Sequence, residues 1–144
     1  MRIEVRNEAG LGERAVEELR RACRRALRAE GARRDAVLSI ALLAEEEMAA
    51  LNRRYTGREG ATDVLAFPMR EESGEGFILG DIAICPAAVD AWREEYGVES
   101  GEALAFVAVH GVLHLLGYED GDEEGAGRMD RRQREILRLA GGAG

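Results

Sequence analysis

Lysine is absent from this 144-residue chain, so all 20 of its basic residues are arginine. Against 28 acidic residues they leave a net charge of −8, which argues against a surface that attracts nucleic acid everywhere. Eight arginines nevertheless crowd the first third: Arg14, Arg20, Arg21, Arg24, Arg25, Arg28, Arg33 and Arg34. Guanidinium groups suit phosphate, so two interpretations stay open, a local phosphate-contacting surface and a solvated helix face.

Cysteine and long apolar runs are equally scarce. Cys23 and Cys85 lie far apart in sequence and fit no paired-thiolate metal motif, so we expect two reduced thiols. No apolar run approaches the ~20 residues that span a bilayer, and residues 1–10 lack the apolar core of a signal peptide. We therefore expect a cytoplasmic protein with no membrane contact. Length and composition predict one domain over residues 1–140, with a flexible tail at 141–144.

The hydrophobic pattern predicts the secondary structure. Alternating or continuous apolar segments indicate strands at residues 2–6, 36–43, 62–69 and 79–85. Apolar residues at helical spacing indicate five helices, at about residues 13–30, 45–54, 87–96, 101–116 and 123–139. Pro68 and Pro86 each end a strand, and residues 70–76 form a polar loop. The order predicts an α+β domain, or a three-layer α/β domain, whose small four-stranded sheet is mixed because the last two strands can pair directly.

The candidate metal ligands lie in residues 110–120, HGVLHLLGYED. His110 and His114 are the only histidines, and their spacing on one helix projects both imidazoles from the same face, as two ligands of a tetrahedral ion require. Gly117 allows a sharp turn that returns Asp120 toward the pair, as in the extended HExxHxxGxxH zinc motif. Two histidines and one carboxylate leave a coordination position open, the mark of a catalytic zinc site, although iron and manganese suit such a set too.

Gly111 stands where a metallopeptidase of this motif has its general base, which weighs against peptide hydrolysis. The segment instead resembles the HGxLHLxGYDH signature of the YbeY family of ribosomal RNA maturation factors. LNRRYTGREGATDVLAFP resembles that family's LNxxYRxxDxPTDVLSFP block, and LGDIAICPAAVDAW resembles its LGDIxI strand and following helix. The three blocks occur in the family's order and cover residues 51–120.

The resemblance implies a single-strand endoribonuclease with a metzincin-like zinc site on the fourth helix, one Zn²⁺ held by His110, His114 and residue 120. It implies a role in 16S rRNA maturation and ribosome quality control, with RNA and the small ribosomal subunit as partners. We take a monomer as the default. Two departures from the family bear on the site: Asp120 replaces a third histidine, and Thr56 replaces an arginine that the resemblance implies contacts RNA phosphate or stabilises charge in the transition state.

Each departure changes the expected chemistry. Aspartate is a legitimate zinc ligand, but it lowers the net charge of the centre and predicts a differently tuned site. Threonine cannot replace a guanidinium, so Arg58 becomes the candidate for phosphate contact and the fourth predicted catalytic residue beside His110, His114 and Asp120. Two other functions stay open: an RNA-binding ribosome-assembly factor with impaired catalysis, and, more remotely, a metallopeptidase.

Overall fold

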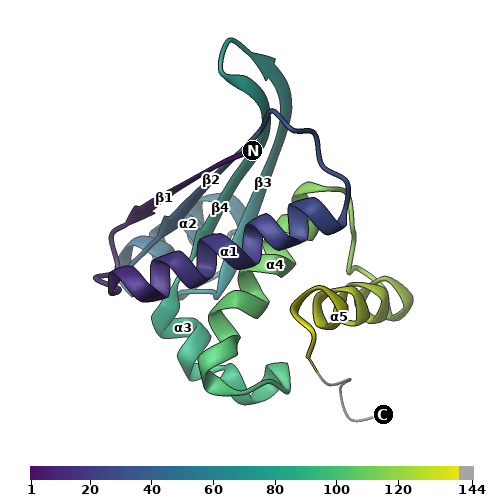
Figure 1. Ribbon diagram of the computed structural model, residues 1–144. Coiled ribbons are helices and arrows are strands. Elements are labelled where there is room, and N and C mark those ends of the chain that lie inside the picture. The colour runs from purple at the N-terminus through teal and green to yellow at the C-terminus, as the bar shows by residue number, and fades with distance from the viewer. Residues whose placement is uncertain (140–144) are drawn as a thin grey trace.

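The four strands predicted from the sequence pair into one sheet (Figure 1). The computed structural model describes residues 1–139 and contains β1 (Arg2–Asn7), β2 (Ala36–Leu42), β3 (Val64–Ser73) and β4 (Gly76–Ile84). Across the sheet the order is β1-β2-β4-β3, with β1, β2 and β4 parallel and β3 antiparallel to β4. The predicted mixed sheet is confirmed.

Within residues 1–139 five α-helices pack around this sheet, as predicted. They are α1 (Glu13–Ala29), α2 (Glu45–Thr56), α3 (Pro86–Ala91), α4 (Ala103–Leu115) and α5 (Glu123–Leu137). The third helix is shorter than predicted. It ends at Ala91, and the chain continues as a 3₁₀ turn over Arg93–Tyr96. A second 3₁₀ turn precedes α4. The result is a single small α+β domain; the tail predicted at residues 141–144 lies outside the described residues.

One prediction about the third and fourth strands was wrong. β3 does not end at Pro68 but runs to Ser73, and the segment expected to be a loop is a β-hairpin with β4. Proline is tolerated there because β3 lies at the edge of the sheet and needs no outward hydrogen bond. The register shifts between Pro68 and Glu71, and Arg70 takes a left-handed φ of 52° at this bulge.

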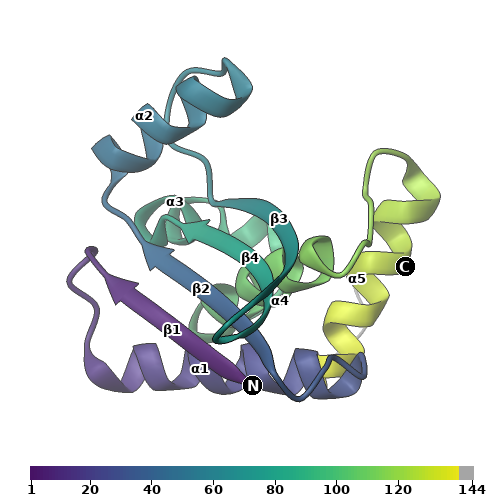
Figure 2. The ribbon, with the colours of Figure 1, turned by 90° about the horizontal axis from the view of Figure 1, so that it is seen from above.

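The sheet is covered on both faces. Figure 2 shows α1 and α4 on one side of the strands and α2 on the other. Alternation along β4 sends Ile82 and Ile84 into the larger core beneath α1 and α4, and Ala83 into a smaller core with Met48 of α2. Both cysteines are buried and free, as predicted. No helix of residues 1–139 is long and apolar enough to cross a membrane.

Candidate metal centre

Burial along α4 singles out its two histidines. Between Phe106 and Leu115, His110 and His114 are the residues that are not fully buried. Gly111, next to the first histidine, faces the sheet, where an added Cβ would lie 2.9 Å from Cγ2 of Ile82. The helix therefore packs its apolar faces against the sheet and α1 and keeps a narrow edge open, and that edge carries both imidazoles.

The turn after α4 returns a carboxylate to this edge, as its glycine predicted. Gly117 has φ 107°, a left-handed conformation that favours glycine, and the N–H of Tyr118 donates back to the carbonyl of Leu113 at 3.0 Å. Asp120 then places Oδ2 3.3 Å from Nε2 of His110 and 3.3 Å from Nε2 of His114. The two Nε2 atoms are 3.1 Å apart, so three potential ligand atoms converge on one point.

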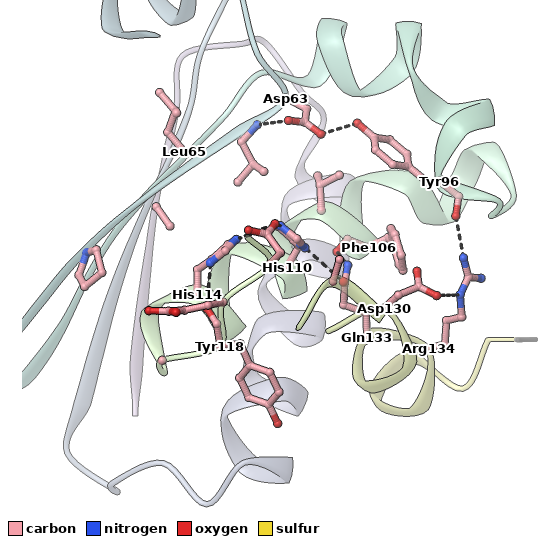
Figure 3. Close-up of a pocket in the computed structure, with 18 of the residues that line it drawn as sticks. Asp63, Leu65, Tyr96, Phe106, His110, His114, Tyr118, Asp130, Gln133 and Arg134 are labelled. Atoms are coloured by element: carbon pink, nitrogen blue, oxygen red, sulfur yellow. Dashed lines mark hydrogen bonds and ion pairs between the residues drawn. The ribbon is translucent and has the colours of Figure 1, made fainter. Parts of the chain in front are cut away.

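Hydrogen bonds on the far side of each ring fix the orientation of the imidazoles (Figure 3). Nδ1 of His110 lies 3.2 Å from Oε1 of Gln133, whose own Nε2 donates to the carbonyl of Phe106 at 3.1 Å. Nδ1 of His114 lies 3.1 Å from the carbonyl oxygen of Tyr118. Because both partners are acceptors, this network assigns a proton to each Nδ1 and leaves both Nε2 lone pairs facing Asp120.

This donor set fits a divalent cation. Three acceptors at 3.1–3.3 Å from one another repel unless positive charge lies between them. The ligand atoms of a tetrahedral zinc ion, each ~2.0–2.2 Å from the metal, are themselves roughly 3.3–3.6 Å apart, close to the separations seen here. Two imidazole nitrogens and one carboxylate oxygen also suit iron or manganese, so the geometry indicates a metal without identifying it.

The three residues open into an acidic cavity of about 770 Å³ between β3, α4 and α5. Its carboxylates, Asp120 included, are Asp63, Glu95, Glu119, Asp120 and Asp130. Its two arginines are already engaged: Arg70 donates to the carbonyl of Leu115 at 3.1 Å, and Arg134 binds Asp130 at 2.9 Å and the carbonyl of Tyr96 at 2.8 Å. Because its carboxylates outnumber its two arginines, the cavity is negatively charged apart from a bound cation and attracts an anionic substrate poorly.

Asp63 and Tyr96 form the rim of the cavity opposite the histidines (Figure 3). The phenol of Tyr96 donates to Oδ2 of Asp63 at 2.6 Å, and the N–H of Val64 donates to Oδ1 at 2.8 Å. Burial, and then the hydrogen bond to this carboxylate, raise the pKa of Tyr96. The charged residue beside the third strand is thus paired, as expected for a carboxylate in such a position.

Arg58 is the one predicted site residue that lies elsewhere. It is exposed in the loop after α2 and does not line the cavity, and its backbone N–H donates to Oγ1 of Thr56 at 3.2 Å. The hydroxyl of Thr56 in turn donates to the carbonyl of Asn52 at 2.7 Å. At the family's arginine position this chain therefore has a threonine whose hydroxyl is hydrogen-bonded within the last turn of α2. A phosphate contact by Arg58 stays a prediction.

Several residues of the cavity were not predicted from the sequence, Gln133 and Arg70 among them. Gln133 carried a usable signal, because it is a polar residue at helical spacing between the buried Met129 and Ile136. A polar side chain in that position usually has a buried partner, here the imidazole of His110. Arg70 carried no such signal, since the β3 bulge that aims it at α4 depends on the pairing with β4.

Comparison with known proteins identifies the family. The model of the family described as Endoribonuclease YbeY matches residues 2–141. The chain belongs to the YbeY family. A protein of Pelotomaculum thermopropionicum named Endoribonuclease YbeY is 39% identical over 136 residues, which cover 88% of this chain and 90% of that protein. One of Anaeromyxobacter with the same name is 38% identical over 142 residues, covering 98% of this chain and 73% of that protein.

A solved structure agrees with the fold. The solution structure of a Thermotoga maritima protein is 27% identical and superposes with a TM-score of 0.65, covering 94% of this chain and 87% of that one. The YbeY resemblance inferred from three sequence blocks is therefore confirmed over almost the whole chain.

Proposed function

We propose that this YbeY-family chain is a metal-dependent single-strand endoribonuclease. It would act in the cytoplasm as a monomer on ribosomal RNA of the small subunit, in 16S rRNA maturation and ribosome quality control. The observation that carries the proposal is the convergence of two imidazole nitrogens and one carboxylate oxygen on the open edge of α4. Family membership supplies the reaction class, since the relatives are named endoribonucleases.

Each residue has a definite task in this proposal. His110, His114 and Asp120 would hold the ion, which would polarise the phosphodiester and supply a nucleophile near neutral pH. Gln133 and the carbonyl of Tyr118 hold the two Nδ1 protons, so both rings present Nε2 without reorientation. Asp120 lowers the charge of the site relative to a third histidine. Arg58 remains the proposed phosphate contact from the loop after α2.

An RNA-binding assembly factor with impaired catalysis is the second candidate. It is favoured by Thr56, whose hydroxyl is committed to Asn52, and by a cavity whose arginines already have partners. A metallopeptidase is disfavoured, because the residue at the general-base position packs against Ile82 and faces away from the cavity. A glutamate in place of Gly111 would have to displace the sheet before it met a substrate.

Cleavage of a labelled single-stranded RNA ending in 16S rRNA precursor sequence separates these functions. We expect cleavage by the parent protein, its loss in chelator and its recovery with zinc. Asp120→Ala should lower the rate by more than about 100-fold, because a ligand is removed. Glu124→Gln is the matched control: it also removes a nearby carboxylate, one that is exposed and paired with Arg128. RNA binding without metal-dependent cleavage would favour the assembly factor, and cleavage of a peptide library would favour the peptidase.

A further inference from the structure

A groove lined with arginines lies on the other side of α5 from the candidate metal centre. It is formed where the second half of α1 meets α5, two helices that Figure 2 shows in contact near the right of the view. Helix α1 contributes Arg21, Arg24, Arg25 and Arg28, and the α5 side contributes Arg132 and Arg138. We refer to these six residues as the arginine groove. Its two carboxylates, Glu18 and Glu135, already pair with Arg14 and Arg132.

The pattern of α1 places its four arginines on the outer face. The residues that α1 buries are Leu19, Ala22, Cys23, Ala26 and Leu27. At 100° per residue, Arg21, Arg24, Arg25 and Arg28 fall around the opposite side of the helix. Within residues 1–139, none of these four guanidinium groups has a carboxylate at ion-pair distance, whereas other arginines of α1 do, such as Arg14 with Glu18 and Arg20 with Glu17.

Unpaired arginines are unexpected in a chain with 28 acidic residues and a net charge of −8. Four like charges on one helix face repel one another, and i,i+4 neighbours such as Arg21 and Arg25 destabilise the helix that carries them. The acidic cavity around His110 shows the opposite distribution, with its arginines engaged by protein acceptors. A polyanionic substrate would therefore find positive charge in the groove and little of it beside the proposed metal ligands.

We propose that the arginine groove binds the phosphate backbone of the RNA strand whose scissile bond lies at the metal centre. This inference rests on the proposed function, because it takes the strand to be cleaved at the metal centre. It assigns the binding of the strand and its cleavage to separate surfaces. Helix α5 links the two, since Gln133 and Arg134 face the cavity while Arg132 faces the groove. A helix with its side chains is ~10–12 Å across, so a strand of several nucleotides can span the two surfaces. Planar guanidinium groups recognise successive phosphates without reading sequence.

The test measures binding with cleavage switched off. A fluorescent single-stranded RNA is titrated in EDTA at several salt concentrations with the parent protein and with Arg21→Gln, Arg25→Gln and Arg28→Gln combined. The matched control combines Arg2→Gln, Arg6→Gln and Arg93→Gln, three exposed arginines that pair with carboxylates and give the same change in net charge. Thermal unfolding checks that both variants remain folded.

The groove variant should bind RNA at least about tenfold more weakly, and its log–log salt slope should fall by roughly 2, since each phosphate contact to a single strand contributes about 0.7. The control should keep the parent's slope. Equal weakening in both variants, or in neither, would overturn the proposal and leave a solvated helix face. Competition by polyglutamate as strong as by RNA would overturn it in favour of an acidic polypeptide partner.

The two proposals can fail separately. If the protein binds RNA through these arginines but never cleaves it, the role of the groove is supported and the endoribonuclease function is overturned. If the protein cleaves RNA in a metal-dependent way and the groove variant binds RNA with unchanged affinity, the endoribonuclease function is supported and the role of the groove is overturned.

Discussion

The two sides of α5 differ in how their polar groups are satisfied. On the side of the candidate metal centre, Gln133 bridges His110 and the carbonyl of Phe106, and Arg134 binds Asp130 and the carbonyl of Tyr96. On the side of the arginine groove, the guanidinium groups of Arg21, Arg25 and Arg28 have no carboxylate partner within residues 1–139.

The side of the metal centre holds its polar side chains in fixed positions, whereas the side of the groove presents unneutralised positive charge. Hydrogen bonds to fixed acceptors hold the imidazoles in one orientation, which a metal site needs. Unpaired guanidinium groups on an exposed face keep their rotamer freedom and supply a field for a mobile polyanion.

Gln133→Leu should have the largest effect on the positioned side. It removes the acceptor of the His110 Nδ1 proton, and losses of such partners typically weaken metal affinity about 10- to 100-fold. Competition with a chromophoric chelator measures the affinity. Gln133→Glu loses the donor to the carbonyl of Phe106 but keeps an acceptor for the His110 proton, and it should bind metal within about tenfold of the parent. Equal affinities of the leucine variant and the parent would show that the ring needs no such support.

Gly111→Ala should destabilise the fold by about 1–3 kcal/mol, because its Cβ would lie 2.9 Å from Ile82 at the interface of α4 and β4. Urea unfolding measures the change. Gly127→Ala is the matched control in α5, where the nearest atom to a new Cβ is 3.7 Å away. There the gain in helix propensity should stabilise the fold by roughly 0.5–1 kcal/mol. Stabilisation in both variants would contradict the close packing of α4.

Tyr96→Phe should cost about 1–2 kcal/mol at neutral pH, through the lost hydrogen bond to the Asp63 carboxylate at the rim of the cavity. The pKa of Tyr96 is raised in the folded chain, so the folded state holds the phenolic proton more tightly than the unfolded state. The contribution is therefore complete below the ordinary tyrosine pKa of about 10 and is lost as the pH rises above it. Unfolding free energies of parent and variant should converge above pH 10, and a constant gap would refute the assignment.

The smallest effect belongs to the unpaired arginines of the groove. Arg25→Gln should change the free energy of unfolding by less than about 0.5 kcal/mol, because its side chain makes no ion pair to lose. Arg132→Gln is the contrasting variant: it loses a half-buried pair with Glu30 at 2.7 Å, which should cost about 1 kcal/mol. Chemical unfolding in parallel measures both. A larger cost for Arg25 than for Arg132 would reverse the contrast between paired and unpaired arginines.

Local sequence patterns predicted most of the fold. Apolar spacing located every strand and helix, because burial imposes a period of two on strands and of 3.6 on helices. It failed at Pro68, where the tolerance of proline depends on β3 being the edge strand. It also failed at the end of α3, where four residues tighten into a 3₁₀ turn before Gly97. The edge position of β3 depends on strand pairing, which the local pattern around Pro68 does not contain.

The site likewise contains residues that local spacing predicted and residues that only tertiary packing brings there. His110, His114 and Asp120 lie within one helix and the turn that follows it, so their spacing alone indicated that they would meet. Gln133 and Arg70 reach the cavity from α5 and from the β3 bulge, and their placement follows from tertiary packing that no local pattern contains. Arg58 was inferred from a family block, and the structure puts it outside the cavity, so its role awaits experiment.

The three-ligand metal centre can be tested by measuring, with plasma mass spectrometry, the metal content of protein purified without added metal. The three converging ligand atoms predict about one zinc, or one other divalent ion, per chain of the parent protein. They also predict its loss in His114→Ala and in Asp120→Ala, with retention in Glu124→Gln. A parent protein without metal, or an Asp120→Ala variant that keeps its ion at full occupancy, would contradict the three-ligand centre.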